Sequence, residues 1–316
     1  RRPPPPPQAP LTMPEGDTLK KAAALLGVMT GQRVTGFESP LPALARNDAL
    51  GATISSVEAR GKNLLIWFDA TRALYTHLRM EGSWHRYLPG TPWRKPARQA
   101  RVILTTEAWI AVCFNAPVVE WLTAWQVLHH PMLASLGPDL LGDATDLEAL
   151  IQQCITRLRI APERPLGEAL LDQRLIAGLG NVYKSELLFI ERLDPFQPVA
   201  NYDDTTLHHL IAVAHKWMRR NLGPGPRQTR WGASRERTWV YGRSGELCPV
   251  CNATLQMRRQ GQLGRSTYYC PVCQQVGAPP PRADPQPPPS RQTPQPSSPA
   301  ARRPRGRVLV RGPAED

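Results

Sequence analysis

Two neighbouring residues near the start of the chain, Pro14 and Glu15 in the stretch LTMPEGDT, have the chemistry of an amine nucleophile and its acid–base partner. A lysine amine, with a pKa of about 10.4, is neutral in roughly one molecule in a few thousand at pH 7, whereas a terminal α-amine is neutral in roughly one in ten. A chain that begins at Pro14 therefore offers a reactive secondary amine that forms an iminium with an electrophilic sugar carbon. Glu15 would exchange protons with the sugar oxygen or the base.

The residues RRPPPPPQAPLT (1–12) precede this pair and make Pro14 an ordinary amide in the chain as written. A proline-rich run of this kind cannot build a core, so we expect a disordered extension that is not part of the mature protein. We predict that the functional protein begins at Pro14 after loss of Met13. N-terminal mass analysis of the native protein tests this, because a retained extension would rule out amine catalysis by Pro14.

Four of the six cysteines form two pairs with the spacing C-x2-C-x18-C-x2-C, while Cys113 and Cys154 stand apart in apolar surroundings. Four thiolates arranged in this way are typical of a closed, tetrahedral structural zinc site, so we predict one Zn²⁺. A reactive dithiol is the alternative, but two CxxC pairs at this spacing argue against it. The predicted ligands are Cys248, Cys251, Cys270 and Cys273.

The segment between these pairs, LQMRRQGQLGRSTYY, alternates like two strands joined by a glycine-containing turn. A bound metal would fix this hairpin, which is too small to be held by hydrophobic burial alone. Arg265 stands at the turn, where its guanidinium is either presented to DNA or exposed to solvent. Spacing alone leaves both interpretations open.

Two further stretches carry side chains suited to nucleic acid. Lys62 in ARGKNLLIWF stands at a turn entering an apolar strand, where it could reach a sugar-phosphate backbone, although a solvated turn lysine is the default. Met80 and His77 in YTHLRMEGSW stand at the end of a strand. An unbranched methionine can wedge into a base stack from which a nucleotide has been extruded, although core packing is the commoner fate of a methionine.

The stretch AGLGN separates two helical patterns, and its glycines permit a tight reversal before Asn181 begins the next helix. Free N–H groups at a helix N-terminus bind phosphate, and Asn181 can add its own amide. The alternative is an N-capping asparagine in an ordinary helix hairpin.

The elements that must position these residues change in kind along the chain. From Asp17, LKKAAALLGVM predicts an amphipathic helix with Asp17 or Thr18 as N-cap and Gly31 beyond its end. Strand-like runs follow without alternating helices, which favours a sandwich over a parallel sheet. These runs cover 52–59, 63–70, 73–78, 100–106 and 108–114. Helical periodicity then predicts helices over 146–158, 164–176, 181–193 and 205–222.

The formal net charge of +13 favours nucleic acid or another polyanion as a partner. No apolar run approaches the roughly 20 residues that a membrane-spanning helix needs, so we expect no membrane partner. No signal-peptide pattern opens the chain, which favours a cytoplasmic, nucleoid-associated protein.

Taken in order, the motifs resemble those of the formamidopyrimidine-DNA glycosylase/endonuclease VIII family and are most similar to actinobacterial endonuclease VIII-like DNA glycosylases. The resemblance covers about residues 13–275, which is essentially all of the foldable chain. It is carried by MPEGDT (13–18), RGKNL (60–64), THLRMEGSW (76–84), LGPDLL (136–141), LLDQRLIAGLGNVYKSE (170–186), WVYGRSGELCPVC (239–251) and GRSTYYCPVCQ (264–274).

The resemblance implies a multidomain α+β fold in which an N-terminal β-sandwich with a leading helix is followed by a helix–two-turn–helix domain and a C-terminal zinc finger built on a β-hairpin. DNA would bind across the cleft between the domains, and we expect the protein to act as a monomer. The expected segments are the extension 1–12, the catalytic domain 13–130, the helix–two-turn–helix DNA-binding domain 131–223, the basic linker 224–237, the zinc finger 238–276 and a disordered Pro/Arg-rich tail 277–316.

The resemblance also implies the roles of the site residues. Pro14 would be the Schiff-base nucleophile and Glu15 the acid–base group. Lys62 and Arg265 would serve both catalysis and DNA binding, Asn181 would bind phosphate with Arg265, and Met80 would fill the void left by the flipped nucleotide. The implied activity is that of a bifunctional DNA glycosylase and abasic-site lyase of base excision repair, which acts on double-stranded DNA with oxidised bases or abasic sites by β,δ-elimination.

Two features point to different substrates. Gly16 after Pro14-Glu15 resembles the endonuclease VIII pattern, which implies oxidised pyrimidines, and we favour these. HLRMEGSW partly resembles the formamidopyrimidine branch, which implies oxidised purines such as formamidopyrimidine or 8-oxoguanine. The sequence is also compatible with a non-catalytic lesion-binding protein of the same fold. A helix-hairpin zinc-ribbon protein would leave MPEG, RGKNL and GRSTYYC unexplained.

Overall fold

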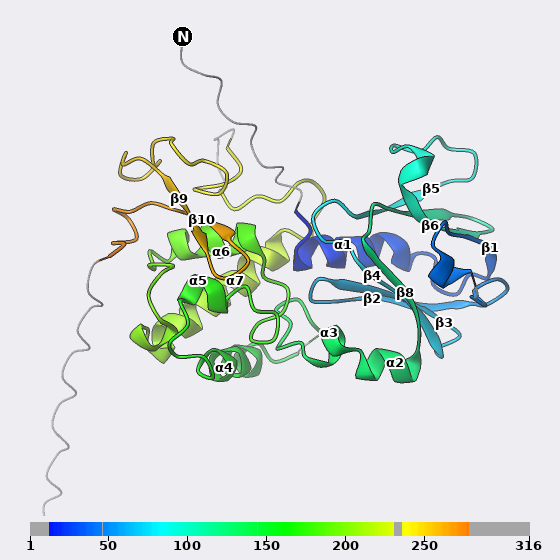
Figure 1. Ribbon diagram of the computed structural model, residues 1–316, viewed down its shortest axis with the longest axis horizontal. Helices are drawn as coiled ribbons and strands as arrows, with labels where there is room; N and C mark the ends of the chain where they lie inside the picture. Colours follow the sequence, from blue (N-terminus) through cyan, green and yellow to red (C-terminus); the bar gives the residue numbers. More distant parts are fainter. Residues whose placement is uncertain (1–12, 46, 144, 231–235, 278–316) are drawn as a thin grey trace, which may run out of the picture. The chain divides into compact units, whose positions relative to one another are not determined.

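The computed structural model describes residues 13–45, 47–143, 145–230 and 236–277 (Figure 1). The predicted extension at 1–12 and all of the predicted tail except Gly277 lie outside the described residues, as does part of the predicted linker 224–237. No helix within the described ranges is long and apolar enough to cross a membrane.

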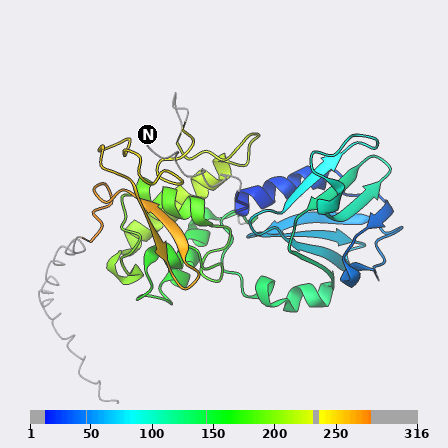
Figure 2. The same cartoon turned by 45° about the horizontal axis from the view of Figure 1, so that its top comes forward.

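The N-terminal part folds into two antiparallel four-stranded sheets, which confirms the predicted sandwich. Figure 2 shows the strands of this part, coloured blue to green, gathered in one half of the molecule. All five predicted strands are present, as β2, β3, β4, β6 and β7. Strands β1, β5 and β8 were not predicted. One sheet has the order β1 (Val34–Glu38), β6 (Ala100–Thr106), β7 (Ile110–Phe114) and β5 (Ser83–Tyr87). The other has the order β2 (Ile54–Arg60), β3 (Asn63–Phe68), β4 (Arg72–His77) and β8 (Val118–Thr123).

Helix α1 (Gly16–Gly27) precedes the sandwich and buries one apolar face, Leu19, Ala22, Ala23 and Leu26, in the same core as the strands. Its N-cap is Glu15, so the prediction of Asp17 or Thr18 was wrong. The reason is that the Glu15 carbonyl already accepts hydrogen bonds from the backbone N–H of Thr18 and of Leu19. Gly31 lies beyond the helix end in a left-handed conformation (φ 83°), as expected.

The second part of the chain is helical and has its own apolar core. Its longer helices α4, α6 and α7 confirm three of the predicted helices, whereas only four residues of the predicted helix 164–176 are helical. Asp172 explains this difference, because its carboxylate accepts the backbone N–H of Arg174 at 3.0 Å and so favours a turn. The helices are α2 (Ala124–His129), α3 (Pro131–Ala134), α4 (Leu147–Leu158), α5 (Leu166–Ala169), α6 (Asn181–Ile190) and α7 (Asp204–Arg220), and the 3₁₀ turns are Pro42–Leu44, Ala97–Gln99 and Val199–Asn201.

Strands β9 (Gln256–Gln260) and β10 (Arg265–Tyr269) form the predicted hairpin. Polar contacts fasten β10 to α6. The buried Lys184 ammonium donates to the carbonyl of Ser266 at 3.0 Å and to Oγ1 of Thr267 at 2.7 Å, and Ser185 Oγ accepts the backbone N–H of Tyr268 at 3.2 Å. The hairpin therefore has a fixed position on the helix that follows the AGLGN turn.

Candidate active site

The carboxylate of Glu15 is seated on the N-terminus of α6. Its Oε2 accepts the backbone N–H of Gly180 at 3.0 Å, and its Oε1 accepts that of Val182 at 2.8 Å. The N–H of Tyr183 adds a longer contact of 3.4 Å to Oε2. Glu15 is fully buried, and the unpaired N–H groups and dipole of a helix N-terminus stabilise a negative charge there. The seat fixes the acid–base candidate directly beside Pro14.

Two glycines of the AGLGN turn make this seat possible. Gly178 adopts a φ of 97°, a conformation that glycine adopts without strain, and its carbonyl accepts the N–H of Gly16 at 2.9 Å. Gly180 leaves open the space that the Glu15 side chain occupies. The turn thus docks the start of α1 onto the start of α6 from a sequence distance of more than 160 residues.

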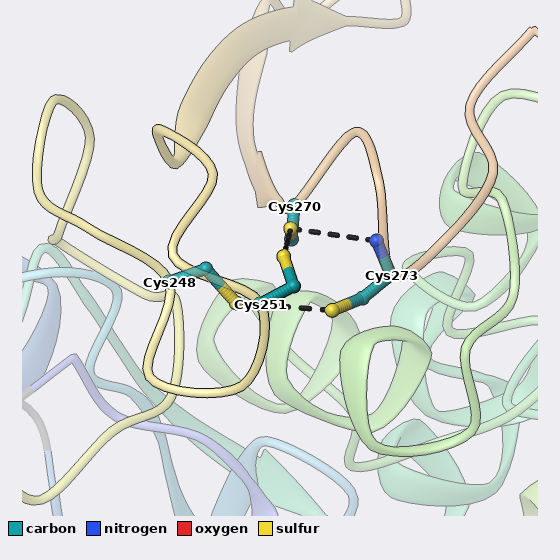
Figure 3. A group of neighbouring side chains, drawn as sticks. All are labelled: Cys248, Cys251, Cys270 and Cys273. Atoms are coloured by element: carbon teal, nitrogen blue, oxygen red, sulfur yellow. Dashed lines mark hydrogen bonds between the residues drawn. The ribbon is translucent and has the colours of Figure 1, made fainter.

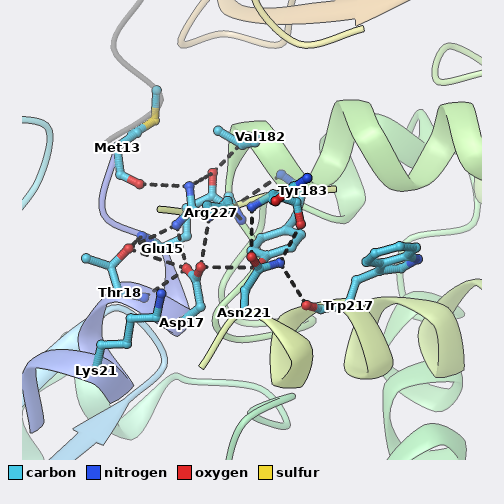
Figure 4. Close-up of polar contacts among 12 residues, drawn as sticks. Met13, Glu15, Asp17, Thr18, Lys21, Val182, Tyr183, Trp217, Asn221 and Arg227 are labelled. Carbon is cyan, nitrogen blue, oxygen red and sulfur yellow. Dashed lines mark hydrogen bonds and ion pairs between the residues drawn. The ribbon is translucent and has the colours of Figure 1, made fainter. Parts of the chain in front are cut away.

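A second buried group, the Arg227 guanidinium, also contacts the start of the chain (Figure 4). It forms a two-pronged ion pair with the carboxylate of Asp17 and stacks over the Tyr183 ring at 5.0 Å. The Tyr183 hydroxyl donates to Asp17 at 3.1 Å. Sequence reasoning missed Arg227 because a lone arginine in a basic linker gives no signal of burial.

Lys62 reaches the same region from the turn between β2 and β3. Gly61 has a φ of 57°, and its N–H donates to Asp139 at 2.7 Å, which ties the turn to the segment before the helical core. Burial lowers the pKa of Lys62 to about 8, the Glu15 charge opposes this, and the charges of Arg265 and Arg227 lower the pKa further. Lys62, Arg265 and Glu15 are therefore close enough to influence one another.

One pocket of about 670 Å³ brings the candidate residues together. Apart from the four cysteines, every residue predicted for the site lines this pocket: Pro14, Glu15, Lys62, Met80, Asn181 and Arg265. Met80 is 52% exposed, as a side chain that inserts into a ligand must be. Asn181 donates its amide N–H to Ser266 Oγ at 2.9 Å, which links the helix terminus to the residue after Arg265.

The pocket also contains residues that sequence reasoning did not assign to it. Tyr75 and Glu120 are cross-strand partners on β4 and β8, and His130 packs against the Tyr75 ring with centroids 4.7 Å apart. Burial, together with the charges of Arg79 and Lys62, lowers the pKa of His77 to about 4, so this imidazole is neutral at pH 7. The register of β4 against β8 places Tyr75 beside Glu120, but this register cannot be known from the sequence before the strands are paired.

The four cysteines of the two CxxC pairs converge at the base of the hairpin (Figure 3). All four Sγ atoms lie within 4.8 Å of one another, with 3.8 Å between Cys248 and Cys273 and 3.4 Å between Cys251 and Cys270. Four sulfurs at about 2.3 Å from a tetrahedral zinc ion would be roughly 3.8 Å apart. The cluster can therefore hold one metal ion.

A buried carboxylate on α6 joins this module to the helical part. Glu186 accepts the backbone N–H groups of Trp239 at 2.7 Å, Val240 at 2.8 Å and Tyr241 at 2.7 Å. It also accepts a hydrogen bond from the Thr229 hydroxyl. Burial raises the pKa of Glu186, and these four donors oppose that rise. The chain that leads into the cysteine module is thus anchored one turn away from the Glu15 seat.

Comparisons with known proteins agree with this architecture. Residues 13–117 match the family model described as the formamidopyrimidine-DNA glycosylase N-terminal domain, and residues 136–230 match the formamidopyrimidine-DNA glycosylase H2TH domain. A protein of Streptomyces coelicolor named probable endonuclease 8 2 is 39% identical over 273 residues, which are 85% of this chain and 96% of the relative. The DNA-(apurinic or apyrimidinic site) lyase Nei2 of Mycolicibacterium smegmatis is 37% identical over 265 residues, 83% of this chain and 99% of the relative.

The fold also matches solved structures. The formamidopyrimidine-DNA glycosylase of Lactococcus lactis, solved with DNA that contains an abasic site, aligns with a TM-score of 0.67 at 24% identity and covers 83% of this chain and 99% of its own. A structure of MutM with DNA that contains carbocyclic 8-oxoguanine aligns with a TM-score of 0.68 at 24% identity, over 83% of this chain and 100% of its own. At 24% identity, these two matches show that the fold is shared and nothing more.

Proposed function

The chain belongs to the formamidopyrimidine-DNA glycosylase/endonuclease VIII family, and on that premise we infer that it is a bifunctional DNA glycosylase and abasic-site lyase of base excision repair that uses Pro14 as its nucleophile. One observation carries this assignment of roles. The buried Glu15 carboxylate lies next to Pro14 in a pocket that Lys62, Asn181 and Arg265 also line. A nucleophile position, an acid–base group and phosphate-binding groups therefore share one site.

The amine requires a chain that starts at Pro14. The match to the family's N-terminal domain model begins at Met13, which supports a functional chain without residues 1–12, and removal of Met13 would then free the Pro14 amine. The freed secondary amine, neutral in roughly one molecule in ten at pH 7, is an activated nucleophile. An acylated Pro14 nitrogen cannot take this part, so processing decides whether the protein is active.

The reaction follows from the chemistry of a secondary amine. The Pro14 nitrogen forms a bond to C1′ of the deoxyribose and loses its proton, while the bond from C1′ to the base breaks and its electron pair leaves with the base. Glu15 takes up the proton that the amine loses and delivers it to the sugar ring oxygen when the ring opens to an iminium. The iminium acidifies the C2′ proton, so the 3′-phosphate leaves by β-elimination, and δ-elimination of the 5′-phosphate follows.

DNA binding is assigned to the rest of the pocket. C1′ is shielded within a stacked duplex, so the nucleotide must be flipped out, and Met80 fills the space that it leaves. Lys62, Asn181 and Arg265 bind the flanking phosphates. The net charge of +13 adds long-range attraction, so affinity falls steeply as salt rises. The proposed partner is double-stranded DNA with oxidised bases or abasic sites. We also predict that the protein is a monomer and that it associates with the nucleoid in the cytoplasm.

The metal of the cysteine cluster is proposed to be Zn²⁺. The Sγ separations suit tetrahedral coordination, and four thiolates without an open position are typical of a structural site. Bound zinc supplies folding free energy to a hairpin that has little core of its own. Cys248, Cys251, Cys270 and Cys273 would hold it and thereby position Arg265 at the pocket.

Oxidised pyrimidines are the favoured substrates. Gly16 follows the endonuclease VIII pattern, and the relatives named endonuclease 8 2 and Nei2, at 39% and 37% identity, are more similar to this chain than the formamidopyrimidine-DNA glycosylase of Rhodospirillum rubrum at 28%. The alternative substrates are oxidised purines, which HLRMEGSW in part favours.

The test is borohydride trapping with protein that starts at Pro14 and a panel of duplexes that carry oxidised pyrimidines, oxidised purines or an abasic site. We expect a covalent adduct, fastest with pyrimidine lesions. The matched control is the chain with residues 1–13 retained, whose Pro14 is an amide and should trap nothing. Tight binding without any adduct from the Pro14-initiated protein would instead support a non-catalytic lesion-binding protein.

A further inference from the structure

Arg227 lies in the segment after α7, yet its guanidinium is buried against the first residues of the folded chain (Figure 4). Its Nε and Nη2 both donate to the Asp17 carboxylate, and Nη2 also donates to Thr18 Oγ1 at 3.0 Å. Its remaining nitrogen, Nη1, donates to the carbonyl oxygen of Met13 at 3.1 Å and lies 3.8 Å from Oε1 of Glu15. The guanidinium therefore contacts residues on both sides of Pro14.

The mechanism described for Pro14 and Glu15 does not explain why a buried charge is placed here. A buried ion pair contributes little net stability compared with apolar side chains of the same shape, although removal of one partner is costly. A buried guanidinium that donates hydrogen bonds to three residues of the chain start, Met13, Asp17 and Thr18, points to a role in the reaction.

Nη1 is close to the nucleophile. The carbonyl oxygen of Met13 and the nitrogen of Pro14 belong to one amide group, so standard bond lengths separate them by about 2.3 Å. With Nη1 at 3.1 Å from that oxygen, Nη1 lies within roughly 5.4 Å of the Pro14 nitrogen. Loss of Met13 removes this acceptor and leaves the guanidinium next to a free amine and the Glu15 carboxylate.

The charged groups around that amine act in opposite directions. Glu15 and Asp17 on α1 favour its protonated form, and Lys62 from the β2–β3 turn, Arg265 from β10 and Arg227 disfavour it. Lys62 and Arg265 line the open pocket, where bound phosphates offset their charge. Tyr183 on α6 stays neutral, because burial raises the pKa of its hydroxyl. Arg227 is buried away from the phosphates, so its charge persists in the DNA complex.

Neighbouring amines already respond to this charge. Burial lowers the pKa of Lys21, and Arg227 lowers it further while Asp17 opposes the change. Arg227 also contributes to the lowered pKa of Lys62, after burial and Arg265. A cation that acts on two lysines at this site acts at least as strongly on an amine within a few ångströms.

We propose that Arg227 is a positioning residue for the Schiff-base step, which holds the first turn of α1 against α6 so that the Pro14 amine faces Glu15, and whose buried charge keeps that amine unprotonated. The inference rests on the proposed function. It assigns a role in the reaction to a buried linker arginine that does not line the pocket.

The test measures single-turnover formation of the borohydride-trapped adduct on abasic-site DNA between pH 5 and 9, with chains that start at Pro14. The variants are Arg227→Lys, Arg227→Met and Arg227→Met with Asp17→Asn, the last of which removes both buried charges together. Arg230→Met, in the same linker, is the matched control. Thermal unfolding establishes which variants fold.

We expect the wild-type rate to rise with pH to a plateau. Arg227→Met should shift this rise by about one pH unit to higher pH, which corresponds to a roughly tenfold lower rate on the acid side. The double variant also lacks the Asp17 charge that favours the protonated amine, so it is compared with Asp17→Asn alone, relative to which its rise should lie at higher pH by the same amount. Arg227→Lys should keep the wild-type profile, as should Arg230→Met. Reductive methylation of Pro14 by formaldehyde without DNA should show the same shift.

A loss by the same factor at every pH would mean that Arg227 only supports the fold, and it would overturn the assignment of its charge. An unchanged profile in a folded Arg227→Met variant would overturn the proposal as a whole. If the wild type forms no adduct at any pH, the proposed function fails and this inference fails with it. A wild-type adduct together with an unshifted variant would refute the inference alone.

Discussion

The side chain of Glu15 occupies the volume that a Cβ on Gly180 would need, since a methyl group there would fall 2.2 Å from Glu15 Cδ. The two residues are 165 positions apart in the sequence, and the Gly180 N–H also donates to the Glu15 carboxylate. The Glu15 side chain, the proposed acid–base group, therefore requires a glycine at position 180. The first expected outcome follows from this relationship.

We expect Gly180→Ala to displace the Glu15 carboxylate and to lower the rate of adduct formation by about 100-fold or more, the range expected when a proton-transfer group is lost. Affinity for abasic-site DNA should change only a few-fold, because the phosphate-binding side chains stay in place. Gly27→Ala is the control, since an added Cβ there meets no described atom within 4 Å. Equal activity of the two variants would disprove the role of this contact.

The lowered pKa of Lys62, about 8, leads to a pH dependence of DNA binding. A phosphate next to Lys62 favours its charged form and raises its pKa in the complex. Below pH 8 the lysine is charged in both states, and above pH 8 free protein must take up a proton to bind. We therefore expect affinity for an abasic-site analogue to fall as pH rises above 8, measured by fluorescence anisotropy at constant salt.

Variants of Lys62 separate this effect from others. Lys62→Met should remove the pH dependence above 8 and lower the salt slope by about one unit, because one phosphate contact is lost. Lys62→Arg keeps the charge at all these pH values and should bind with little pH dependence. A wild-type affinity that is flat from pH 7 to 9.5 would contradict the assignment.

Met80 is half-exposed at the rim of the pocket, where it is proposed to fill the vacated stack. We expect Met80→Ala to slow base excision from duplex DNA by about tenfold, because unstacking a base costs a few kcal/mol and the wedge offsets part of this cost. Single-stranded DNA with the same lesion should be affected much less. Met257→Ala removes another exposed methionine, on β9, and should leave the ratio of the two rates unchanged.

Loss of one cysteine ligand should remove the metal. We expect Cys251→Ser to purify with far less than one metal ion per chain, and to lose DNA affinity because Arg265 is no longer held at the pocket. The sandwich and the helical part have their own apolar cores, so their thermal unfolding should change little. Cys154→Ala, a buried thiol outside the cluster, should keep its metal content, measured by elemental analysis.

Much of the site could be predicted from the sequence because its residues lie in short, local motifs. The cysteine spacing predicted a cluster that the structure confirms, and the glycines of AGLGN predicted the turn before α6. The pocket residues Pro14, Lys62 and Arg265 were found from turn positions and from the family resemblance. The cysteine, glycine and turn signals each depend on residues at most 25 positions apart, as Cys248 and Cys273 are.

The residues that were missed depend on contacts between distant segments. Arg227 pairs with Asp17 across 210 positions, and nothing in GPGPRQTR distinguishes this arginine from its neighbours. Tyr75 and Glu120 meet only through the register of β4 and β8. The N-cap of α1 was misassigned for a related reason, since Glu15 caps the N-terminus of α1 with its backbone carbonyl while its side chain binds α6.

Helix α6 has only ten residues, and three separate parts of the molecule are attached to it: Glu15 at its first turn, β10 through Lys184, and the entry to the cysteine module through Glu186. An inserted residue between Gly180 and Glu186 would rotate the later attachment points by about 100° relative to the first. Insertions at the exposed Gly90 turn would shift none of them. We therefore expect functional variants of this protein to tolerate insertions and deletions at the turns of the sandwich. They should tolerate none within the seven positions 180–186.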